Sequence, residues 1–418
     1  MKVMVIGAGI GGLTAALSLH AAGIDAQVHE SVADMRGLGV GINLQPNAVR
    51  ELVELGLGDA LAAAAIETAE LRYYNKHGQL IWSEPRGLAA GYAWPQYSID
   101  RGDLQMILLA AVKQRIGAGN VFAGHHLVSF EQDGSGVTGH FMDRESGKDL
   151  PPQRADILIG CDGIHSAVRA RLYPDEGLPV SSGRIQWRGV VEGEPFLGGR
   201  THVTMGFSQR RAVVYPVSRK VADRGRSLIN WVAVLGKQSA SGVRATWDRK
   251  VPKDRFFGQF KDWNFRWIKF ADLICDTDDI YEFPKDDRDP LPRWSFGRVT
   301  LVGDAAHTML PIGAQAGSQA IVDARVLAFA LATTRMAEWA LELYEQQRRP
   351  IMNAVTMRNR KFGPAIVMEI AEQRAPQGFK NIEDVMTHRE LADIALAYKV
   401  EAGFDPAALN QRASLTVC

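Results

Sequence analysis

A glycine-rich turn at the start of the chain constrains the fold most strongly. Residues 2–6, Lys-Val-Met-Val-Ile, form an apolar, β-branched run that is typical of a buried parallel strand. The glycines that follow suit a tight turn, a close approach of the backbone to a pyrophosphate, and close packing of the next helix on the strand. The residues of this turn that we assign to a nucleotide site are Gly7, Gly9, Ile10, Gly11 and Gly12.

A helix predicted over 13–22 and a second strand over 24–29 complete the unit, and Glu30 follows the second strand directly. The positive end of the helix faces the phosphates, and the carboxylate can accept hydrogen bonds from both ribose hydroxyls of an adenosine. A bare glycine triplet also fits an ordinary tight turn, but strand, helix and acid together indicate a dinucleotide site. The motif does not separate FAD from NAD, whereas Glu30 disfavours NADP because it would repel a 2′-phosphate.

Two later segments repeat the pattern of an apolar strand that gives way to a turn and a helix. Asp162 and Gly163 follow a predicted strand over 155–160, and Gly303 and Asp304 end a strand that begins near residue 297. The acid at 304 can bind a ribityl hydroxyl. The loop over 311–318 then enters a helix from about 319 to 331 and offers N–H groups to an electron-rich ring edge, with candidate contacts at Pro311, Gly313 and Ala316.

Further candidate cofactor contacts lie between the first two motifs. Alternate glycines over 37–43, Gly41 among them, would let the main chain lie against a flat ring, although a flexible loop is the alternative. Arg101 and Gln105 lie four residues apart at the start of a helix predicted over 102–112 and could reach a pyrophosphate or ribityl chain. A solvated helix face is the alternative for this pair.

The pattern of residues between these segments predicts a second domain. A hairpin over 69–82 and alternating, aromatic stretches within 183–284 indicate antiparallel strands, and the chain after residue 339 is helical and charged. We predict an α/β protein with a discontinuous Rossmann-like FAD-binding domain (1–70, 97–180 and 285–355). An interleaved β-sheet substrate domain (71–96 and 181–284) and a C-terminal helical segment (356–418) complete the prediction.

Composition narrows the class of partner to a small molecule. The 418 residues carry 48 Lys and Arg against 47 Asp and Glu, a net charge of +1 without a basic block, so neither nucleic acid nor an anionic membrane is indicated. No apolar run is long enough to span a membrane, and the first strand leaves no room for a signal peptide, so we expect a cytoplasmic protein. The three cysteines form no metal-ligand spacing and the histidines are scattered, so we predict no metal.

The three motifs, in this order, resemble those of the group A flavoprotein monooxygenases, the family of para-hydroxybenzoate hydroxylase and salicylate hydroxylase. The resemblance covers residues 1 to about 355. It implies that the glycine turn and Glu30 hold the ADP part of FAD, that Asp162 serves FAD and the passing nicotinamide, and that Asp304 holds ribityl and phosphate. It also matches Arg101 to an arginine that contacts FAD.

A closer resemblance is to the phenazine hydroxylase subgroup, which oxidises 5-methylphenazine-1-carboxylate with decarboxylation. It rests on four segments: 38–43, 82–87, 101–109 and 289–292. After Pro311 the chain departs from the wider family, because Ala314, Ala316 and Ser318 stand where many members have Gly, Gly and Asn. Backbone contacts could survive these changes, but the mobility of the flavin ring could differ.

The resemblance implies a mechanism in which NADH or NADPH reduces FAD, oxygen adds at C4a, and the hydroperoxide transfers one oxygen to an electron-rich aromatic carbon. Pro311 would lie near the reacting edge, and a helix N-terminal proline is its ordinary alternative. Trp187, Arg188 and Tyr215 are candidates for a substrate wall and an anion contact, with core packing or a surface ion pair as the alternative. An FAD reductase without productive oxygen transfer and a redox-dependent binding protein are the competing functions. The oligomeric state stays open.

Overall fold

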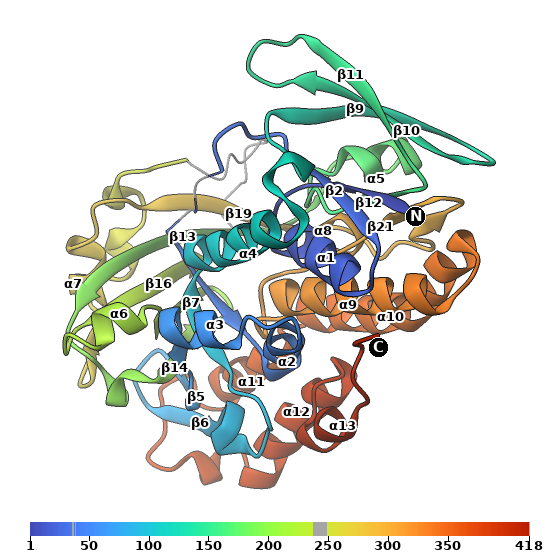
Figure 1. Ribbon diagram of the computed structural model, residues 1–418. Helices are drawn as coiled ribbons and strands as arrows, with labels where there is room; N and C mark the ends of the chain where they lie inside the picture. Colours follow the sequence, from blue (N-terminus) through green and yellow to red (C-terminus); the bar gives the residue numbers. More distant parts are fainter. Residues whose placement is uncertain (36, 38, 237–248, 418) are drawn as a thin grey trace.

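A six-stranded sheet organises the nucleotide-binding half of the protein. The structure is a computed structural model that describes residues 1–35, 37, 39–236 and 249–417 (Figure 1). In sheet order its strands are β20 (Ser295–Phe296), β21 (Val299–Leu301), β12 (Ile157–Gly160), β1 (Lys2–Ile6), β2 (Asp25–His29) and β8 (Val121–Phe122). All neighbours are parallel except β20 and β21. The carboxyl ends of β1, β2, β12 and β21 therefore meet at one edge, where ligands bind in sheets of this type.

Long helices cover this sheet and bury its apolar strands. α1 (Ile10–Ala21) packs against both α4 (Arg101–Ile116) and α9 (Ala316–Thr333), and α9 packs against α10 (Ala337–Arg360). The central strands β1 and β12 are almost completely buried, as expected for parallel strands covered on both faces. The helices predicted at 13–22, 102–112 and 319–331 are present, with ends that differ by a few residues.

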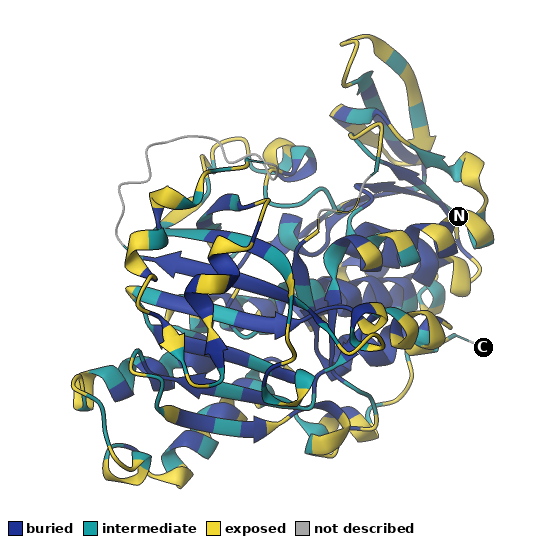
Figure 2. Ribbon diagram, turned by 90° about the vertical axis from the view of Figure 1, so that its left-hand side faces the viewer, coloured by how far each residue is buried: buried dark blue, intermediate teal, exposed yellow. Residues whose placement is uncertain are grey.

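A seven-stranded, mostly antiparallel sheet forms the second half. Its order is β19 (Tyr281–Asp287), β13 (Val180–Gly193), β16 (Ser227–Leu235), β15 (Arg210–Pro216), β14 (Thr201–Phe207), β5 (Glu70–Tyr74) and β6 (Leu80–Pro85). The hairpin predicted at 69–82 is β5 and β6. Aromatic side chains from one face of this sheet build a separate core with Phe256, Phe260 and Phe270. Figure 2 shows the strands largely buried and the exposed residues gathered on turns and outer helix faces.

Smaller sheets and short helices complete the fold. β3 (Gly41–Leu44), β7 (Tyr97–Asp100) and β4 (Ile66–Glu67) form one sheet, and β17 (Asn264–Phe265) pairs with β18 (Ile268–Lys269). An arm of β9 (His125–Asp133), β10 (Gly136–Asp143) and β11 (Asp149–Ala155) projects at the top of Figure 1. The shorter helices are α2 (Pro46–Glu54), α3 (Gly58–Ala64), α5 (Ala167–Leu172), α6 (Arg219–Ala222), α7 (Phe270–Cys275) and α8 (Asp304–His307).

The chain ends in helices that reach back to both halves. α11 (Ile366–Arg374), α12 (His388–Glu401) and α13 (Pro406–Gln411) follow α10. Residues of α11 and α12 build a third apolar cluster with β5, β6, Leu310 and Ile312. Lys399 of α12 forms an ion pair with Glu84 of β6 at 2.7 Å, so these helices are fastened to the second sheet as well.

Membership of the two large sheets supports the division into domains, which remains a proposal. Strands of the six-stranded sheet fall within the segments assigned to FAD binding, although β19 of the other sheet continues to Asp287 rather than ending at 284. Among the described residues, no helix has the length and apolar character needed to cross a bilayer.

Candidate functional site

The glycine turn between β1 and α1 has the geometry of a phosphate-binding loop. Gly7 has a φ of +104°, a backbone conformation that glycine adopts readily, and a Cβ on Gly12 would lie 1.9 Å from the Gly7 carbonyl oxygen. A Cβ on Gly9, in contrast, would meet nothing within 4 Å. Gly7 thus makes the turn, Gly12 lets the helix pack, and Gly9 borders open space.

Within the described residues, α1 has no acidic residue in its first turn and no side chain that caps its N-terminus. Its N-cap residue, Gly9, has no side chain with which to accept a hydrogen bond from the first N–H groups of the helix. Ile10 is the first helical residue and is buried, and a Cβ on Gly11 would lie 3.4 Å from the Cβ of Ala320 in α9. The unsatisfied N–H groups and the helix dipole therefore favour an anion at this point.

Glu30 and Gln105 lie beside this turn. The backbone N–H groups of Ala8 and Val32 donate to the two oxygens of the Glu30 carboxylate, at 2.7 and 2.9 Å. The side-chain amide of Gln105, from α4, donates to the carbonyl of Ala8 at 2.9 Å. The structure thus brings both residues to the dinucleotide loop, and each carboxylate oxygen has further capacity to accept from a ribose hydroxyl.

Asp162 joins β12 to α5. Its carboxylate accepts hydrogen bonds from the Ser166 hydroxyl at 2.5 Å and from the N–H of Ala167 at 2.7 Å, so it caps the start of α5. Gly163 has a φ of +76°, and a Cβ there would meet nothing within 4 Å.

Burial raises the pKa of the Cys161 thiol well above its usual range, which argues against a nucleophilic role for this cysteine.

Asp304 and Arg101 lie close together at the same edge of the sheet. Asp304 begins α8 directly after Gly303, whose φ is +62°. Burial raises the pKa of Asp304 while His307 and Arg101 oppose that shift, and burial lowers the pKa of Arg101 while Asp304 opposes it. Both residues nevertheless keep some accessible surface. This combination is expected of side chains that line an enclosed space within the protein.

A buried ionic network supports the segment that carries Asp304. Asp323 of α9 hydrogen-bonds with His307 at 2.5 Å, and it accepts from Arg348 at 2.6 Å and from the N–H of Gly303 at 3.2 Å. Burial alone would raise the pKa of Asp323, but His307 and Arg348 lower it to about 2. Sequence reasoning did not find this network, because its members come from separate elements and form no local motif.

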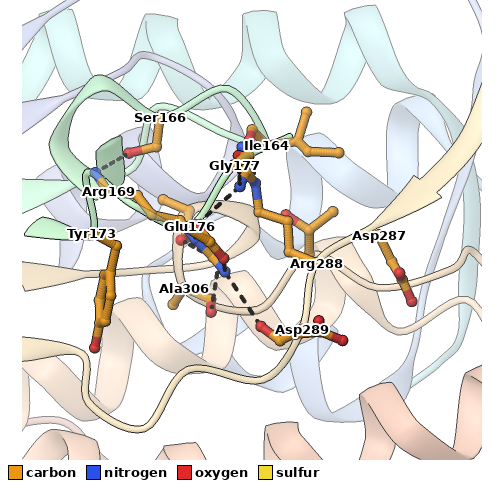
Figure 3. A network of polar contacts seen from close by, with 12 residues as sticks. Ile164, Ser166, Arg169, Tyr173, Glu176, Gly177, Asp287, Arg288, Asp289 and Ala306 are labelled. Atoms are coloured by element: carbon orange, nitrogen blue, oxygen red, sulfur yellow. Dashed lines mark hydrogen bonds and ion pairs between the residues drawn. The ribbon is translucent and has the colours of Figure 1, made fainter. Parts of the chain in front are cut away.

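Arg169 ties the second motif to the third. Its buried guanidinium donates to the carbonyls of Ala305 at 3.0 Å and Ala306 at 3.3 Å and forms an ion pair with Glu176 (Figure 3). Arg288 binds the same Glu176 carboxylate at 2.9 Å. Sequence reasoning missed Arg169 as a positioning residue, although its place at the end of the second motif was a signal that could have found it.

The loop over 311–318 leads into a second helix N-terminus that the described residues leave without a capping anion. Pro311 is exposed, Ala316 is the first residue of α9, and the first turn of α9 holds no acid. A Cβ on Gly313 would lie 2.2 Å from the Tyr398 hydroxyl, which itself donates to the carbonyl of Ile312 at 3.2 Å. Tyr398 of α12 therefore packs against this loop and hydrogen-bonds to it.

Two residues that distinguish this loop from the wider family have visible structural roles. Ala314 has a φ of +53°, a left-handed conformation in which glycine is favoured. The hydroxyl of Ser318 accepts a hydrogen bond from the N–H of Gln45 at 3.0 Å and so joins α9 to the start of α2. The helix α9 therefore still begins at Ala316 with these side chains in the loop.

Gly41 meets the second sheet at Arg188 and Tyr215. Arg188 donates to the Gly41 carbonyl at 2.5 Å, the Gly41 N–H donates to Asn230 at 2.6 Å, and a Cβ on Gly41 would lie 2.6 Å from the Tyr215 ring. Leu38, in the same predicted loop, lies outside the described residues. Gly41 is thus the point where backbone of the nucleotide-binding half touches the candidate substrate sheet.

The placement of Trp187 corrects its assignment as a substrate wall. Trp187 is only 1% exposed, stacks on Phe256 with ring centroids 4.6 Å apart, and donates its indole N–H to Glu282 at 2.9 Å. Because neighbouring residues of a strand point to opposite faces, Trp187 lies in the outer aromatic core while Arg188 faces the other way. The alternative of ordinary core packing therefore describes Trp187.

The residues present fit a flavin dinucleotide. Across the described ranges, the first turns of α1 and α9 carry no acidic residue, Gly9 and Gly163 border open space, and Glu30 stands at the end of the second strand. FAD would need these features for its pyrophosphate, its adenosine ribose and the edge of its ring.

Comparison with known proteins gives the same assignment. The model of a family described as FAD binding domain matches residues 1–253 and 276–359. Phenazine 1,6-dicarboxylic acid hydroxylase PhzS of Lysobacter antibioticus is 47% identical to this chain. The match covers 86% of this chain and 89% of the relative's own length. The 3-amino-4-hydroxybenzoate 2-monooxygenase PtmB3 of Streptomyces platensis is 32% identical over 96% of both chains.

A solved structure extends the likeness to three dimensions. Klebsiella pneumoniae HpxO, complexed with FAD and uric acid, superimposes on this structure with a TM-score of 0.77 at 26% sequence identity. The match covers 95% of this chain and 96% of the HpxO chain. The fold predicted from sequence is thereby confirmed. The chain belongs to the FAD-binding family of aromatic monooxygenases, and FAD is its cofactor.

Proposed function

We propose that this protein hydroxylates a flat, carboxylated N-heteroaromatic substrate, with a phenazine carboxylate as the candidate and NAD(P)H and dioxygen as co-substrates. In the candidate reaction the carboxyl group leaves as carbon dioxide; one oxygen atom of dioxygen enters the product and the other leaves as water. The single observation that carries the proposal is the contact of Arg188 and Tyr215, from the seven-stranded sheet, with Gly41 at the start of β3. A 47% identical relative whose name describes a phenazine hydroxylase supports it.

We propose that FAD binds at the carboxyl edge of the six-stranded sheet. Bound FAD supplies hydride acceptance from NAD(P)H and the activation of oxygen. The N-terminus of α9 would stabilise negative charge on the ring edge, and Pro311, exposed beside it, would border the reacting position. The full proposed set is Gly7, Gly9, Ile10, Gly11, Gly12, Glu30, Gly41, Arg101, Gln105, Asp162, Gly163, Gly303, Asp304, Pro311, Gly313 and Ala316.

Arg188 and Tyr215 are the residues proposed to orient the substrate. Burial raises the pKa of Tyr215, so its hydroxyl stays protonated and can donate a hydrogen bond. Within the described part of the chain, Nε of Arg188 and Nδ2 of Asn230 are buried donors without a partner. Unpaired buried donors are costly, and a carboxylate or ring nitrogen of a substrate would satisfy them. These donors therefore suit an anionic heteroaromatic better than a neutral hydrocarbon.

Rapid reduction and product analysis together test the proposal. The purified flavoprotein is mixed anaerobically with NADH or NADPH, with and without 5-methylphenazine-1-carboxylate, and loss of flavin absorbance is followed before oxygen is admitted. We expect the phenazine to accelerate reduction and a hydroxylated, decarboxylated product to form. Reduction that is indifferent to the phenazine and yields only hydrogen peroxide would refute this substrate and favour a reductase.

A further inference from the structure

Pro311 lies at the centre of a tight three-residue turn. The N–H of Ile312 donates to the carbonyl of Leu310 at 2.7 Å, which closes a hydrogen bond around the proline. A proline suits this position because its ring fixes φ near the value that the common form of such a turn requires. Pro311 itself is exposed, whereas Leu310 and Ile312 on either side are buried in the third apolar cluster. The turn therefore presents the proline while its two neighbours are anchored in the core.

Two side chains from the C-terminal part of the protein bind the ends of this turn. The side-chain amide of Asn359, near the end of α10, donates to the carbonyl of Leu310 at 3.2 Å. The hydroxyl of Tyr398, in α12, lies 3.2 Å from the carbonyl oxygen of Ile312 and 3.0 Å from Oδ1 of Asn359, and it donates to one of them at a time. Both side chains are almost completely buried, so water does not weaken these contacts.

A strained corner of the backbone packs against the Asn359–Tyr398 pair. Phe362 and Gly363, shortly after α10, have left-handed backbones with φ of +69° and +46°. A Cβ on Gly363 would lie 3.0 Å from Oδ1 of Asn359 and 3.2 Å from the Tyr398 ring, so the backbone fills the space beside the pair. A left-handed conformation costs free energy in a bulky residue such as Phe362, and conformations of this kind cluster where a functional part of a protein has to be held in place.

The turn leads directly into α9. Gly313 and Ala314, which follow the turn, have φ of +76° and +53°. A Cβ on Gly313 would overlap with the Tyr398 hydroxyl, so the loop contacts this side chain a second time. Ala316 is then the first residue of α9. Because only a few residues separate Ile312 from the helix, a shift of the turn would also move the first N–H groups of α9.

We infer that Asn359 and Tyr398 are positioning residues for the flavin: they fix the turn at Pro311, and with it the N–H groups at the start of α9 that face the ring edge. The inference rests on the proposed function, in which FAD lies against this loop, and adds two residues that touch no ligand. Uptake of a hydride from NAD(P)H gives the neutral flavin ring a negative charge. Donors that are already in place stabilise such a charge better than mobile ones, because nothing has to reorganise when it appears. The pair therefore raises the reduction potential of the bound flavin.

The reduction potential of the holoenzyme tests this role. The wild-type protein and the variants Tyr398→Phe and Asn359→Leu are reduced anaerobically beside a reference dye, without aromatic substrate, and the potential is read from the absorbance of flavin and dye at equilibrium. We expect each substitution to lower the preference for reduced over oxidised flavin roughly tenfold, which moves the potential by about 30 mV to more negative values. The double variant should shift it little further, because the two side chains act as one unit.

Tyr92→Phe is the matched control. The buried Tyr92 hydroxyl donates to the carbonyl of Phe404 at 2.7 Å, so this variant also removes a hydrogen bond between a tyrosine and a main-chain carbonyl, but one made to Phe404 instead of the loop over 311–318. Urea unfolding of each apoprotein should show similar losses of stability for Tyr92→Phe and Tyr398→Phe, because the bonds are of the same kind. Only Tyr398→Phe should shift the potential.

An unchanged potential in Tyr398→Phe would overturn the inference, even if its Kd for oxidised FAD rose, because the loop would then contribute to binding alone. An equal shift in Tyr92→Phe would also overturn it, by assigning the effect to general loosening of the C-terminal helices. The aromatic substrate takes no part in these measurements. Oxidation of the phenazine carboxylate by a wild-type enzyme whose potential does not depend on Tyr398 removes the inference alone, and a shift without such oxidation removes the proposed substrate alone. Tyr398→Phe deletes one oxygen atom and keeps the ring, so it decides the matter even if Asn359→Leu fails to fold.

Discussion

Replacing Gly9 by alanine should remove FAD binding while leaving the apoprotein intact. A Cβ at this position would meet nothing within 4 Å, and Gly9 has a φ of −74°, which any residue adopts. The methyl group therefore strains nothing in the fold, and the change in unfolding free energy should stay within about 1 kcal/mol. It would, however, occupy the space in which the backbone is proposed to approach the pyrophosphate.

The expected loss of affinity follows from the hydrogen bonds at stake. An N–H bonded to a charged oxygen contributes about 1.5–3 kcal/mol, so displacement of the pyrophosphate from one or two such donors raises the Kd for FAD by roughly 10²-fold or more. FAD titration of the apoprotein, followed by quenching of flavin fluorescence, measures this constant, and urea unfolding of the same apoprotein measures its stability.

Gly12→Ala provides the matched comparison in the same turn. Its Cβ would lie 1.9 Å from the Gly7 carbonyl oxygen, whereas ordinary contacts begin near 3.4 Å, so α1 would have to move away from β1. Overpacking of this kind costs about 1–3 kcal/mol or more of unfolding free energy. Wild-type FAD affinity in Gly9→Ala, or equal destabilisation by the two substitutions, would refute the reasoning.

Three further predictions concern the substrate face, the flavin loop and the buried network. Arg188→Gln should raise the Kd for an aromatic carboxylate roughly 10–100-fold without lowering flavin content, as measured by ligand titration and absorbance; an unchanged Kd would remove Arg188 from the substrate site. Ala314, with a φ of +53°, should tolerate glycine within about 0.5 kcal/mol but lose about 1–2 kcal/mol as valine, judged by urea unfolding. The pKa of Asp323 is depressed to about 2, so its ionised form contributes about 2 kcal/mol of stability above pH 4 that is lost as the pH falls towards 2. The unfolding free energy of Asp323→Asn should therefore lie below that of the wild type at pH 7, and the gap should narrow below pH 4; a pH-independent gap would contradict this.

Local patterns were sufficient to predict the nucleotide-binding elements. The strand, glycine turn and helix at 2–22 and the hairpin at 69–82 are encoded by neighbouring residues, because apolar periodicity and turn glycines act over short distances. The ends of the helices were less accurate: α1 begins at residue 10 rather than 13, and α4 continues to 116 rather than 112. Helix ends depend on capping contacts that the pattern of apolar residues does not contain.

Features that depend on pairing between distant segments could not be predicted. The sequence does not show whether Trp187 or Arg188 faces the proposed substrate site, because this depends on how β13 pairs with its neighbouring strands. The arm over β9 to β11 was not foreseen either, because β11 carries two adjacent prolines, Pro151 and Pro152, and polar residues that do not read as a strand.

The hydrogen bonds between the C-terminal helices and the loop over 311–318 bear on the order in which the cofactor site forms during synthesis. Tyr398 binds the carbonyl of Ile312, and the carbonyl of Ala402 accepts a hydrogen bond from Gln319 in the first turn of α9 at 2.9 Å. Every sequence motif for FAD has left the ribosome well before these residues are translated, yet the loop that meets the ring lacks its backing until they arrive. We therefore expect FAD to be held stably only after these residues are made, so that a chain that stops before residue 398 retains less flavin than the full-length protein.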